Sequence, residues 1–450
     1  MMTIDFDAVI IGAGPAGSAA AILLARAGWS VALVEKHSFP RRKVCGECLA
    51  ASNLPLLQAL GVGAAFDAAA GPALHEVVLM RGQRSAVADL PAAADPTQRW
   101  GRALGRETLD CLLLEQARAV GADILQPWSV STIRGSAGDW HCQLRAGAGD
   151  RGGITLRSPL TIAAHGSWEP PPIHQPIHQP NHQPIALPAH GPATTPWQRP
   201  PQRAHDLLAF KANFHGATLP NGQLPVLCLD GGYGGMVVAD GGITTLACCV
   251  RRDRLDSLRR AAPGQSAGDT VEAWLRVEND GVRQVLRTAR REGPWLAAGP
   301  IAPGIRLRVD DRVFRLGNAA GEAHPILGEG MSMALQSAVL LCRHLLSHAG
   351  PRQVPGALQQ RRIAAAYAAE WRRAFTPRLR LAAAFAQLAM RPAAATGLVA
   401  LAQAWPGLLT LGARFGGKVC SVATPPWVLA GAGLDQRPHR AFQDTAEDSL

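Results

Sequence analysis

The sequence has little lysine and lacks a signal-like apolar run at its start. Only Lys36, Lys43, Lys211 and Lys418 occur among 450 residues although the formal net charge is +11, so arginines scattered along the chain supply most of the positive charge. A nucleic-acid-binding tract would cluster its cations, and we expect no nucleic-acid partner. The nine cysteines are an odd number and show no framework of spacings. These features predict a cytoplasmic protein without structural disulfide bonds.

The first 36 residues have the pattern of a dinucleotide-binding unit. An apolar strand, Asp5–Ile11, leads into a glycine-rich turn, a helix then runs to Ala27, and a second strand covers Ser30–Glu35. In such a βαβ unit, backbone N–H groups at the helix N-terminus approach a pyrophosphate, and the acidic residue accepts hydrogen bonds from a ribose. We therefore predict a site for an ADP-bearing dinucleotide, and the motif alone does not choose between NAD and FAD. Its residues are Gly12, Ala13, Gly14, Pro15, Ala16, Gly17, Glu35 and Lys36.

The rest of the chain predicts a second, strand-rich unit and a helical end. The length and an apolar content of 47% suit two or three structural units with cores of their own. Residues 207–250 are strand-like and punctuated by glycine, which is typical of an antiparallel sheet. A strand at 313–316 precedes a helix at 330–346, and we expect helices beyond residue 360. A further helix is expected over 108–120, with strands over 122–127, 139–145 and 160–164.

Residues 171–201 have a different composition. His-Gln-Pro occurs there three times at four-residue spacing, among further prolines. Because proline at every fourth position excludes a helix, we predict an extended, mobile insertion. On a helix, His174, His178 and His182 would present metal ligands on one face, but without the helix we expect no metal site.

Residues 392–413 carry no charge but are interrupted by Pro406 and three glycines. A buried or surface-lying pair of helices fits this pattern better than a membrane span. Basic residues outnumber acidic residues in two ranges, 251–315 and 352–391. We therefore leave open a peripheral membrane contact through the C-terminal helices.

Three further motifs follow the glycine-rich turn along the chain. They are Phe39–Glu47, Gly101–Arg106, and Gly317–Pro325 followed by Gly328-Glu-Gly330. Together with the turn, they resemble the flavoprotein monooxygenases of the p-hydroxybenzoate-hydroxylase type and the neighbouring geranylgeranyl-reductase-like flavoproteins. The resemblance covers residue 5 to about residue 345, apart from the proline-rich insertion.

The resemblance implies an α/β fold. It comprises an FAD-binding Rossmann-like domain of the glutathione-reductase type, an inserted antiparallel β-sheet substrate domain and a helical C-terminal region. The expected boundaries place the FAD-binding domain at 1–75, 101–170 and 301–346, the substrate domain at 76–100 and 202–300, the insertion at 171–201 and the helical region at 347–450.

The resemblance also extends the set of cofactor-binding residues and makes FAD the expected dinucleotide. An asparagine stands at position 318 where the superfamily usually has an aspartate that binds a ribitol or ribose hydroxyl, and we expect its amide oxygen to accept the same hydrogen bond. His165-Gly166 stands where relatives commonly have Asp-Gly. Because that pair has been linked to both FAD and NAD(P)H in the family, we expect the NAD(P)H contacts of this chain to differ from those of the relatives. The further residues implied to bind FAD are Arg42, Cys45, Gly46, Arg106, Gly317, Asn318, Gly328, Gly330 and Met331.

Candidate residues for catalysis and substrate binding are fewer. His324 and Pro325 lie where the superfamily places a proline near the flavin ring, and the histidine is either a proton relay or a hydrogen-bonded pocket residue. Tyr233 stands among glycines, which let a strand pass close to a ligand or form a bulge. Cys45-Gly-Glu-Cys48 lacks a second pair at metal spacing, so we expect this loop to pack against the flavin and no metal to bind.

The function implied by the resemblance is an FAD-dependent monooxygenase of secondary metabolism. NAD(P)H reduces the flavin, O2 adds at C4a, and the hydroperoxide transfers one oxygen to an aromatic, polyketide-like or lipid-like molecule. A reductase of isoprenoid double bonds is a competing hypothesis, although the tunnel motif of those relatives is absent around Tyr233. A halogenase would need a lysine for hypohalous acid and a Trp-x-Trp-x-Ile-Pro segment, which we do not find. Two further hypotheses are a flavoprotein that oxidises a tryptophan in a partner protein and a non-catalytic flavin-binding module.

Overall fold

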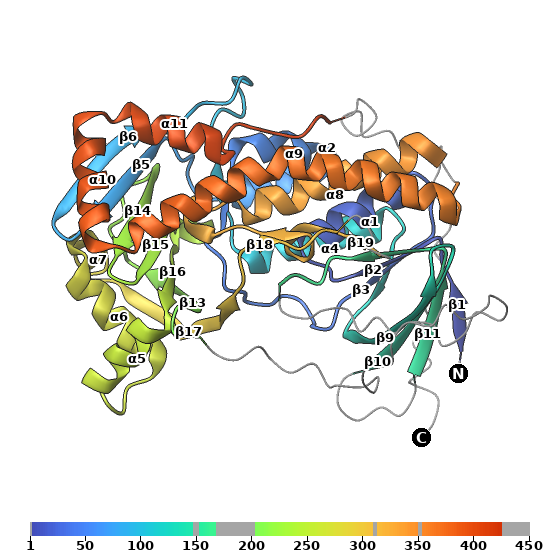
Figure 1. Cartoon of the computed structure of the whole chain (residues 1–450), viewed down its shortest axis with the longest axis horizontal. Coiled ribbons are helices and arrows are strands. Elements are labelled where there is room, and N and C mark those ends of the chain that lie inside the picture. Colours follow the sequence, from blue (N-terminus) through green and yellow to red (C-terminus); the bar gives the residue numbers. More distant parts are fainter. Residues whose placement is uncertain (1, 147–152, 168–202, 309–312, 350–352, 425–450) are drawn as a thin grey trace, which may run out of the picture.

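The protein is described by a computed structural model that covers residues 2–146, 153–167, 203–308, 313–349 and 353–424 (Figure 1). The predicted 171–201 insertion lies outside these residues. Figure 1 shows two β-rich parts side by side, with the C-terminal helices running along one edge of both.

A parallel sheet forms the centre of the first part. Its strand order is β19-β12-β2-β3-β8, and every neighbouring pair is parallel. Alternate residues of β2 enter different cores: Ala8 and Ile10 face one set of helices, and Val9 and Ile11 face a second sheet. Burial on both faces explains why these strands are almost wholly apolar. Their bounds are β2 Ala8–Ile11, β3 Val31–Val34, β8 Asp123–Leu125, β12 Leu160–Ala163 and β19 Phe314–Arg315.

Helices cover one face of this sheet and a four-stranded sheet covers the other. On the helical side, α1 packs between α4 and α8, mainly through alanine and leucine side chains. On the other side, the sheet β1-β11-β10-β9 buries Trp140 and Leu144 against the central strands. The helices are α1 Pro15–Arg26, α2 Leu54–Ala59, α3 Gly63–Ala69, α4 Arg106–Ala119 and α8 Gly330–Ala349, and the strands are β1 Thr3–Asp5, β9 Trp128–Ser136, β10 Asp139–Ala146 and β11 Gly153–Ser158.

The second part is built on a seven-stranded sheet of order β17-β13-β16-β15-β14-β5-β6. The sheet is antiparallel apart from the β14–β5 pair, because the hairpin β5–β6 comes from an earlier segment of the chain. Helices α5 to α7 cover one face, around Trp274. The bounds are β5 Glu76–Arg81, β6 Arg84–Asp89, β13 Leu207–His215, β14 Gln223–Leu229, β15 Gly232–Val238, β16 Thr244–Arg251, β17 Arg290–Ile301, α5 Arg252–Ala261, α6 Ala267–Glu278 and α7 Asp280–Val285.

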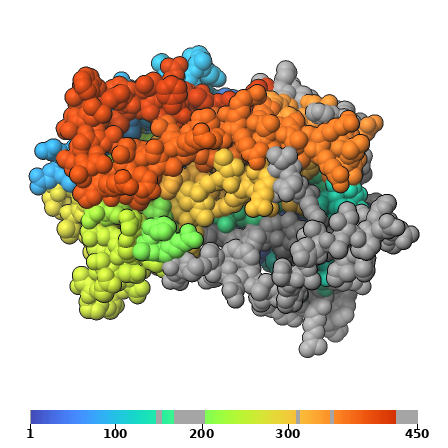
Figure 2. Space-filling view, viewed as in Figure 1, coloured from blue at the N-terminus to red at the C-terminus, as the bar shows by residue number. Residues whose placement is uncertain are grey.

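The three C-terminal helices close the other face of the seven-stranded sheet. Helix α9 (Ala357–Ala389) crosses both parts, α10 (Pro392–Ala404) turns away from it by 110°, and α11 (Gly407–Gly416) follows. Figure 2 shows α10 and α11, in red, on the surface, with a hollow between them and α9. The predicted helix pair at 392–413 is therefore present. No single helix of the described residues is long and apolar enough to span a membrane, although the bent pair α9–α10 passes that test on length and composition.

Short two-stranded ladders complete the junction between the two parts. Strand β4 pairs with β7, and β18 pairs with β20. These ladders bring the segment after β3 and the segment before α8 to the boundary where the parallel sheet meets the seven-stranded sheet. Their bounds are β4 Cys48–Leu49, β7 Arg102–Ala103, β18 Gly304–Ile305 and β20 Gly321–Glu322.

Candidate functional site

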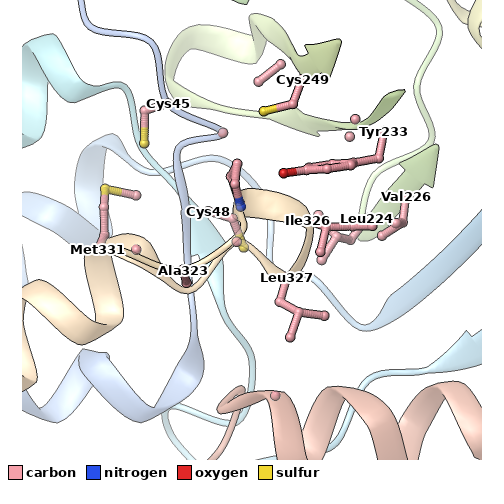
Figure 3. A pocket seen from close by; sticks show the side chains of 18 of the residues that line it. Cys45, Cys48, Leu224, Val226, Tyr233, Cys249, Ala323, Ile326, Leu327 and Met331 are labelled. Carbon is pink, nitrogen blue, oxygen red and sulfur yellow. The ribbon is translucent and has the colours of Figure 1, made fainter. Parts of the chain in front are cut away.

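One cavity of about 480 Å³ lies where the two parts meet. One end is bordered by the glycine-rich turn, the 43–48 loop and the start of α8, and the other end lies between the seven-stranded sheet and helices α9 to α11. Figure 3 shows side chains from both ends around this space, with Cys45 and Met331 toward one side and Leu224, Val226 and Tyr233 toward the other. The cavity therefore joins residues that the sequence assigned to the cofactor with residues assigned to the substrate.

The glycine-rich turn has the geometry that its sequence predicts. Gly12 has a φ of +102°, and a Cβ there would lie 2.6 Å from the carbonyl oxygen of Ala164. A Cβ on Gly17 would lie 1.9 Å from the oxygen of Gly12, so the helix can approach the strand only without a side chain. Gly14 faces the cavity instead. The atom nearest to a Cβ on Gly14 would be an Arg106 guanidinium nitrogen, at 3.7 Å. Gly14, Pro15 and Ala16, at the start of α1, line the cavity, so the positive end of the helix dipole faces it, and no acidic residue in the first turn offsets this charge.

Glu35 lies beneath the turn rather than in the cavity wall. Its buried carboxylate accepts hydrogen bonds from the backbone N–H groups of Ala13 and His37, each at 3.0 Å, and pairs with Arg41 at 3.4 Å. Glu35 thus holds the turn in place and keeps a carboxylate where a ribose is expected. The neighbouring Lys36 is exposed and does not line the cavity, because the chain turns outward after β3.

Positive charge concentrates beside the turn. Arg106 is buried, and both Nε and Nη2 donate to Asp110 at 2.7 Å, an arrangement that outweighs the effect of burial and raises the pKa of Arg106. Lys43 lines the cavity, and burial together with the charges of Arg106 and Arg41 lowers the pKa of Lys43 to about 8. The expected ligand Arg42 does not line the cavity, because its guanidinium turns toward Glu107 and the carbonyl of Glu292.

The second helix N-terminus lies opposite, at α8. Gly317, Asn318, Gly328, Gly330 and Met331 all line the cavity. The amide nitrogen of Asn318 donates to Ser167 at 2.9 Å and to Glu322 at 3.4 Å. The amide oxygen forms no hydrogen bond with another described residue, so it is the atom that Asn318 offers to a ligand hydroxyl.

These features fit FAD. Two helix N-termini and the cations Lys43 and Arg106 suit a pyrophosphate, and a Cβ on the cavity-lining Gly46 or Gly330 would meet no atom within 4 Å. A planar group could therefore approach the backbone there. In the part of the chain that the structure describes, no group of three or more His, Cys, Asp or Glu residues could hold a metal ion, and all nine cysteines are unpaired.

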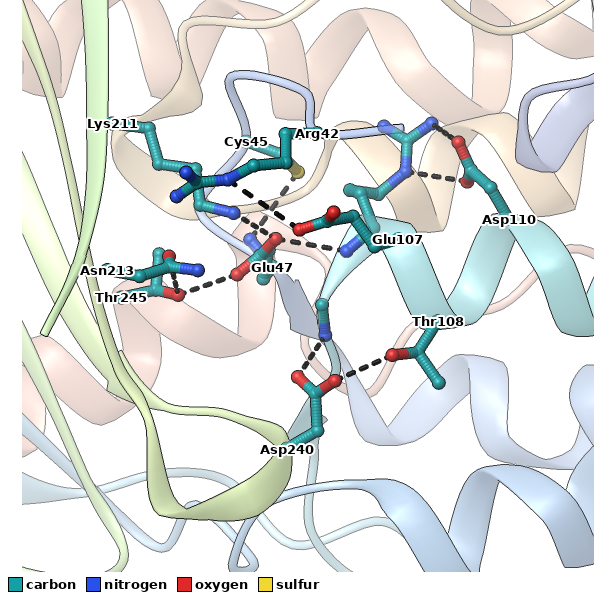
Figure 4. Close-up of polar contacts among 12 residues, drawn as sticks. Arg42, Cys45, Glu47, Glu107, Thr108, Asp110, Lys211, Asn213, Asp240 and Thr245 are labelled. Carbon is teal, nitrogen blue, oxygen red and sulfur yellow. Dashed lines mark hydrogen bonds and ion pairs between the residues drawn. The ribbon is translucent and has the colours of Figure 1, made fainter. Parts of the chain in front are cut away.

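A buried glutamate joins the 43–48 loop to the seven-stranded sheet (Figure 4). Glu47 is 2% exposed and has a φ of +57°, an uncommon conformation for a residue with a side chain. Its Oε1 accepts hydrogen bonds from Lys211 Nζ on β13 and from the Arg106 backbone N–H at 3.0 Å, and its Oε2 accepts one from Thr245 on β16 at 2.6 Å. The loop that carries Lys43 and Cys45 is thus held to two strands of the other sheet.

A second carboxylate supports the same junction. Asp240, in the turn between β15 and β16, accepts hydrogen bonds from the Gly105 backbone N–H at 2.8 Å and from the Thr108 hydroxyl at 2.6 Å (Figure 4). It therefore satisfies donors at the N-terminus of α4 from a distant part of the chain. The helix begins at Arg106, two residues before the predicted start, which places the Arg106 side chain in the first turn.

The far end of the cavity is apolar and contains a phenol–imidazole pair. Tyr233 is 1% exposed, and its hydroxyl lies 3.1 Å from Nδ1 of His324. Burial raises the pKa of Tyr233 and lowers the pKa of His324, so both are neutral near pH 7, and in the Nε2–H tautomer of the imidazole the hydroxyl donates to Nδ1. His324 itself does not line the cavity but Pro325 does. The β15–β16 register runs without a shift past Tyr233, so no bulge lies there.

Sequence reasoning missed a buried cluster at the cavity wall. Lys418 lies 3.3 Å from Glu329 and 3.7 Å from the Cys48 sulfur, and its interactions with these two groups outweigh burial and raise the pKa of Lys418. Burial raises the pKa of Glu329. The rarity of lysine was the signal that could have found this cluster, since Lys43, Lys211 and Lys418 all lie at or beside the cavity.

A protein-family model matches the N-terminal part of the chain. Residues 5–187 match the model of the FAD binding domain. This range includes the glycine-rich turn, the 43–48 loop and Arg106.

Curated relatives match parts of the chain. Conditioned medium factor receptor 1 of Dictyostelium discoideum is 25% identical over 361 residues, 74% of this chain and 62% of the relative. Menaquinone reductase of Mycobacterium tuberculosis is 38% identical over 120 residues, 26% of this chain and 28% of the relative. The chain thus spans less than two thirds of the length of these relatives.

Solved structures share the fold over most of the chain at low sequence identity. The myxobacterial chondrochloren halogenase CndH superposes with a TM-score of 0.69 at 16% identity, covering 94% of this chain and 99% of that one. A probable FAD-dependent monooxygenase of Pseudomonas aeruginosa superposes with a TM-score of 0.62 at 18% identity, covering 88% of this chain and 99% of that one. A geranylgeranyl bacteriochlorophyll reductase-like protein of Thermoplasma acidophilum superposes with a TM-score of 0.60 at 14% identity, covering 95% of this chain and 96% of that one. The expected α/β fold with an FAD-binding domain is confirmed.

The Glu47–Lys211 pair makes a prediction for stability. Lys211→Met leaves a buried carboxylate without its cation, and we expect the free energy of unfolding to fall by about 3–5 kcal/mol. Denaturant unfolding of the purified protein measures this change. Arg157→Met, which breaks an exposed pair with Asp139, is the control and should change the free energy of unfolding far less, because water screens an exposed pair. Equal losses in the two variants would contradict the role given to the pair.

The lowered pKa of Lys43 predicts how FAD binding depends on pH. With a pKa of about 8 before FAD binds and a higher pKa beside a bound pyrophosphate, Lys43 must take up a proton on binding above that pH. The FAD dissociation constant should therefore be flat below about pH 7.5 and rise by up to about tenfold per pH unit above about pH 8. Fluorescence titration of the apoprotein with FAD measures it.

Lys43→Arg is the matched variant for this titration. Arginine stays charged throughout the range, so the dissociation constant should be nearly independent of pH. The same slope in Lys43→Arg and in the unmodified protein would assign the effect to another group.

Proposed function

We propose that the chain, whose residues 5–187 match the FAD binding domain and whose fold is shared with a halogenase, a monooxygenase and a geranylgeranyl-reductase-like protein, is an NAD(P)H-driven, FAD-dependent monooxygenase. It inserts one oxygen atom of O2 into an apolar, phenol-bearing small molecule. The observation that carries the proposal is the continuous cavity that connects the FAD-fitting end to an apolar chamber with a neutral phenol–imidazole pair.

The lining of the chamber supports an apolar substrate. Leu79, Leu224 and Val226 of the sheet, Ile326 of the turn before α8 and Phe385 of α9 are among the side chains that line it. A lipid-like or aromatic molecule is favoured there by burial of its apolar surface. The same side chains exclude water, which protects reactive oxygen chemistry from side reactions.

The Tyr233–His324 pair supports a phenolic substrate. We assign His324 the Nε2–H tautomer, in which the Tyr233 hydroxyl donates to Nδ1 and can accept a hydrogen bond from a substrate hydroxyl at the same time. A proton that leaves the substrate then moves through Tyr233 to Nδ1, where the neutral imidazole holds it. The resulting phenolate is richer in electrons and reacts more readily with an electrophilic oxygen. Bound FAD supplies the electron transfer from NAD(P)H and the reaction with O2.

A second candidate function is halogenation. A lysine does face the cavity, Lys418, paired with Glu329, although sequence reasoning expected no lysine for this role. The Trp-x-Trp-x-Ile-Pro segment is absent from the sequence, and the Glu329 carboxylate already engages the ammonium. We therefore place halogenation second.

Turnover with isotopic oxygen tests the proposal. The FAD-loaded protein receives NADPH and a long-chain alkylphenol under ¹⁸O2, with and without bromide, and in parallel without oxygen. We expect one ¹⁸O atom in the product, no effect of bromide and no product without oxygen. Mass spectrometry of the product provides the measurement. A reduced product formed without oxygen would assign a reductase, and a brominated product would assign a halogenase.

Tyr233→Phe is the matched variant for this reaction. It keeps the ring in the chamber but removes the hydroxyl that leads to His324. Product formation should fall by about 10²-fold or more, since general acid–base catalysis contributes about 10²–10⁴-fold. The flavin content should not change. Full activity in this variant would remove the proton path from the proposal.

A further inference from the structure

Exposed apolar side chains gather on the C-terminal helices. Of the eleven large apolar side chains that are exposed in the described part of the chain, six lie on the end of α9, on α10 and α11, and at the turn between α10 and α11. Trp405 is 64% exposed and Phe415 is 65% exposed, so neither is part of the core. Such a grouping on one surface marks an interaction site. The six residues, called here the apolar rim, are Leu388, Leu401, Trp405, Leu408, Leu411 and Phe415.

Three residues of the apolar rim border the cavity, and the other three lie beside them in sequence on α11 and before it. Leu388, Leu401 and Leu408 are exposed and also line the cavity. Figure 2 shows the hollow between α9, α10 and α11 at this place. The exposed apolar surface is thus continuous with the apolar chamber that ends at Tyr233, and a molecule entering by this route meets apolar groups from the outside inward.

The charge around the apolar rim is positive. Residues 371–424 contain no aspartate or glutamate. The exposed residues Arg380, Arg391 and Arg414 lie on or beside these helices, and none of their guanidinium groups forms an ion pair with another described residue. Three acidic residues of other elements lie beside these helices: Asp89 of β6, whose backbone carbonyl accepts a hydrogen bond from Thr410, the buried Glu329, which pairs with Lys418, and Asp230, which pairs with Arg254. Net positive charge beside exposed Trp, Phe and Leu side chains is complementary to an anionic lipid surface.

We propose that α10 and α11 dock on an anionic phospholipid membrane, with the cavity entrance facing the bilayer. The two helices are short and lie on the surface, which suits burial of their apolar side chains at the boundary between headgroups and acyl chains. Trp405 is of the residue type that prefers this boundary. A second copy of the chain is a poorer occupant, because two such surfaces would bring like charges together. An apolar substrate, which the proposed function requires, would then pass from the bilayer into the chamber without crossing water.

Vesicle flotation with the full-length, FAD-loaded protein tests this proposal without any substrate. The vesicles contain two parts phosphatidylcholine to one part phosphatidylglycerol, and pure phosphatidylcholine vesicles serve as the comparison. We expect the protein to float with the anionic vesicles and much less with the neutral ones. The variant Trp405→Ser, Leu411→Gln, Phe415→Gln should bind at least about tenfold more weakly. Arg391→Gln with Arg414→Gln should lose about 25-fold on anionic vesicles alone, at about fivefold per charge.

The control variant removes exposed apolar groups elsewhere. Val277→Gln with Leu358→Gln changes two side chains that are 81% and 67% exposed and lie outside the rim, and its flotation should equal that of the unmodified protein. Flavin absorbance and melting temperature verify that each variant is folded. Failure of the unmodified protein to float with anionic vesicles would overturn the proposal, as would equal flotation of the rim variant. Concentration-dependent dimerisation that the rim variant abolishes, without vesicle binding, would assign the surface to a second copy instead.

Discussion

The buried Glu47 carboxylate is the interaction on which the site depends. It receives hydrogen bonds from Lys211 and Thr245 of the seven-stranded sheet and from the Arg106 backbone N–H at the start of α4. Three segments far apart in the chain therefore meet at one side chain. A buried charge is tolerated only when it is paired and fully hydrogen-bonded, so the two parts cannot separate here without leaving ions in an apolar environment. This constraint fixes the 43–48 loop between the glycine-rich turn and the chamber.

The cavity follows from that junction. On one side, the loop places Lys43 and Cys45 beside two helix N-termini, where a pyrophosphate and a planar ring system fit. On the other side, the sheet contributes Tyr233, and the C-terminal helices contribute the apolar wall. Lys418 and Glu329 tie the end of α11 to the start of α8, so the same charged contacts that border the cofactor end also hold the entrance helices. Cofactor site, chamber and entrance are thus parts of one structural unit.

Local patterns predicted the elements but not their long-range pairs. The glycine-rich turn and the start of α8 could be located because strand, turn and helix are adjacent in sequence, and Gly14 and Gly330 both face the cavity. Tyr233 and His324 were singled out separately, yet no periodicity relates residues 91 positions apart. The Glu47–Lys211 and Cys48–Lys418 contacts span 164 and 370 positions and depend on tertiary packing alone. Arg42 was assigned to the cofactor from its motif, but the guanidinium turns to Glu107.

In the proposed arrangement, one cavity holds the flavin and an apolar substrate in contact, and flavin absorbance tests this contact most directly. Titration of the FAD-loaded protein with a long-chain alkylphenol should give a saturable flavin difference spectrum. Val226→Trp fills the chamber from β14 and should abolish the spectrum without lowering flavin content, whereas Val277→Trp on the exposed surface should leave it unchanged. A difference spectrum that persists in Val226→Trp, or none in the unmodified protein, would contradict the account.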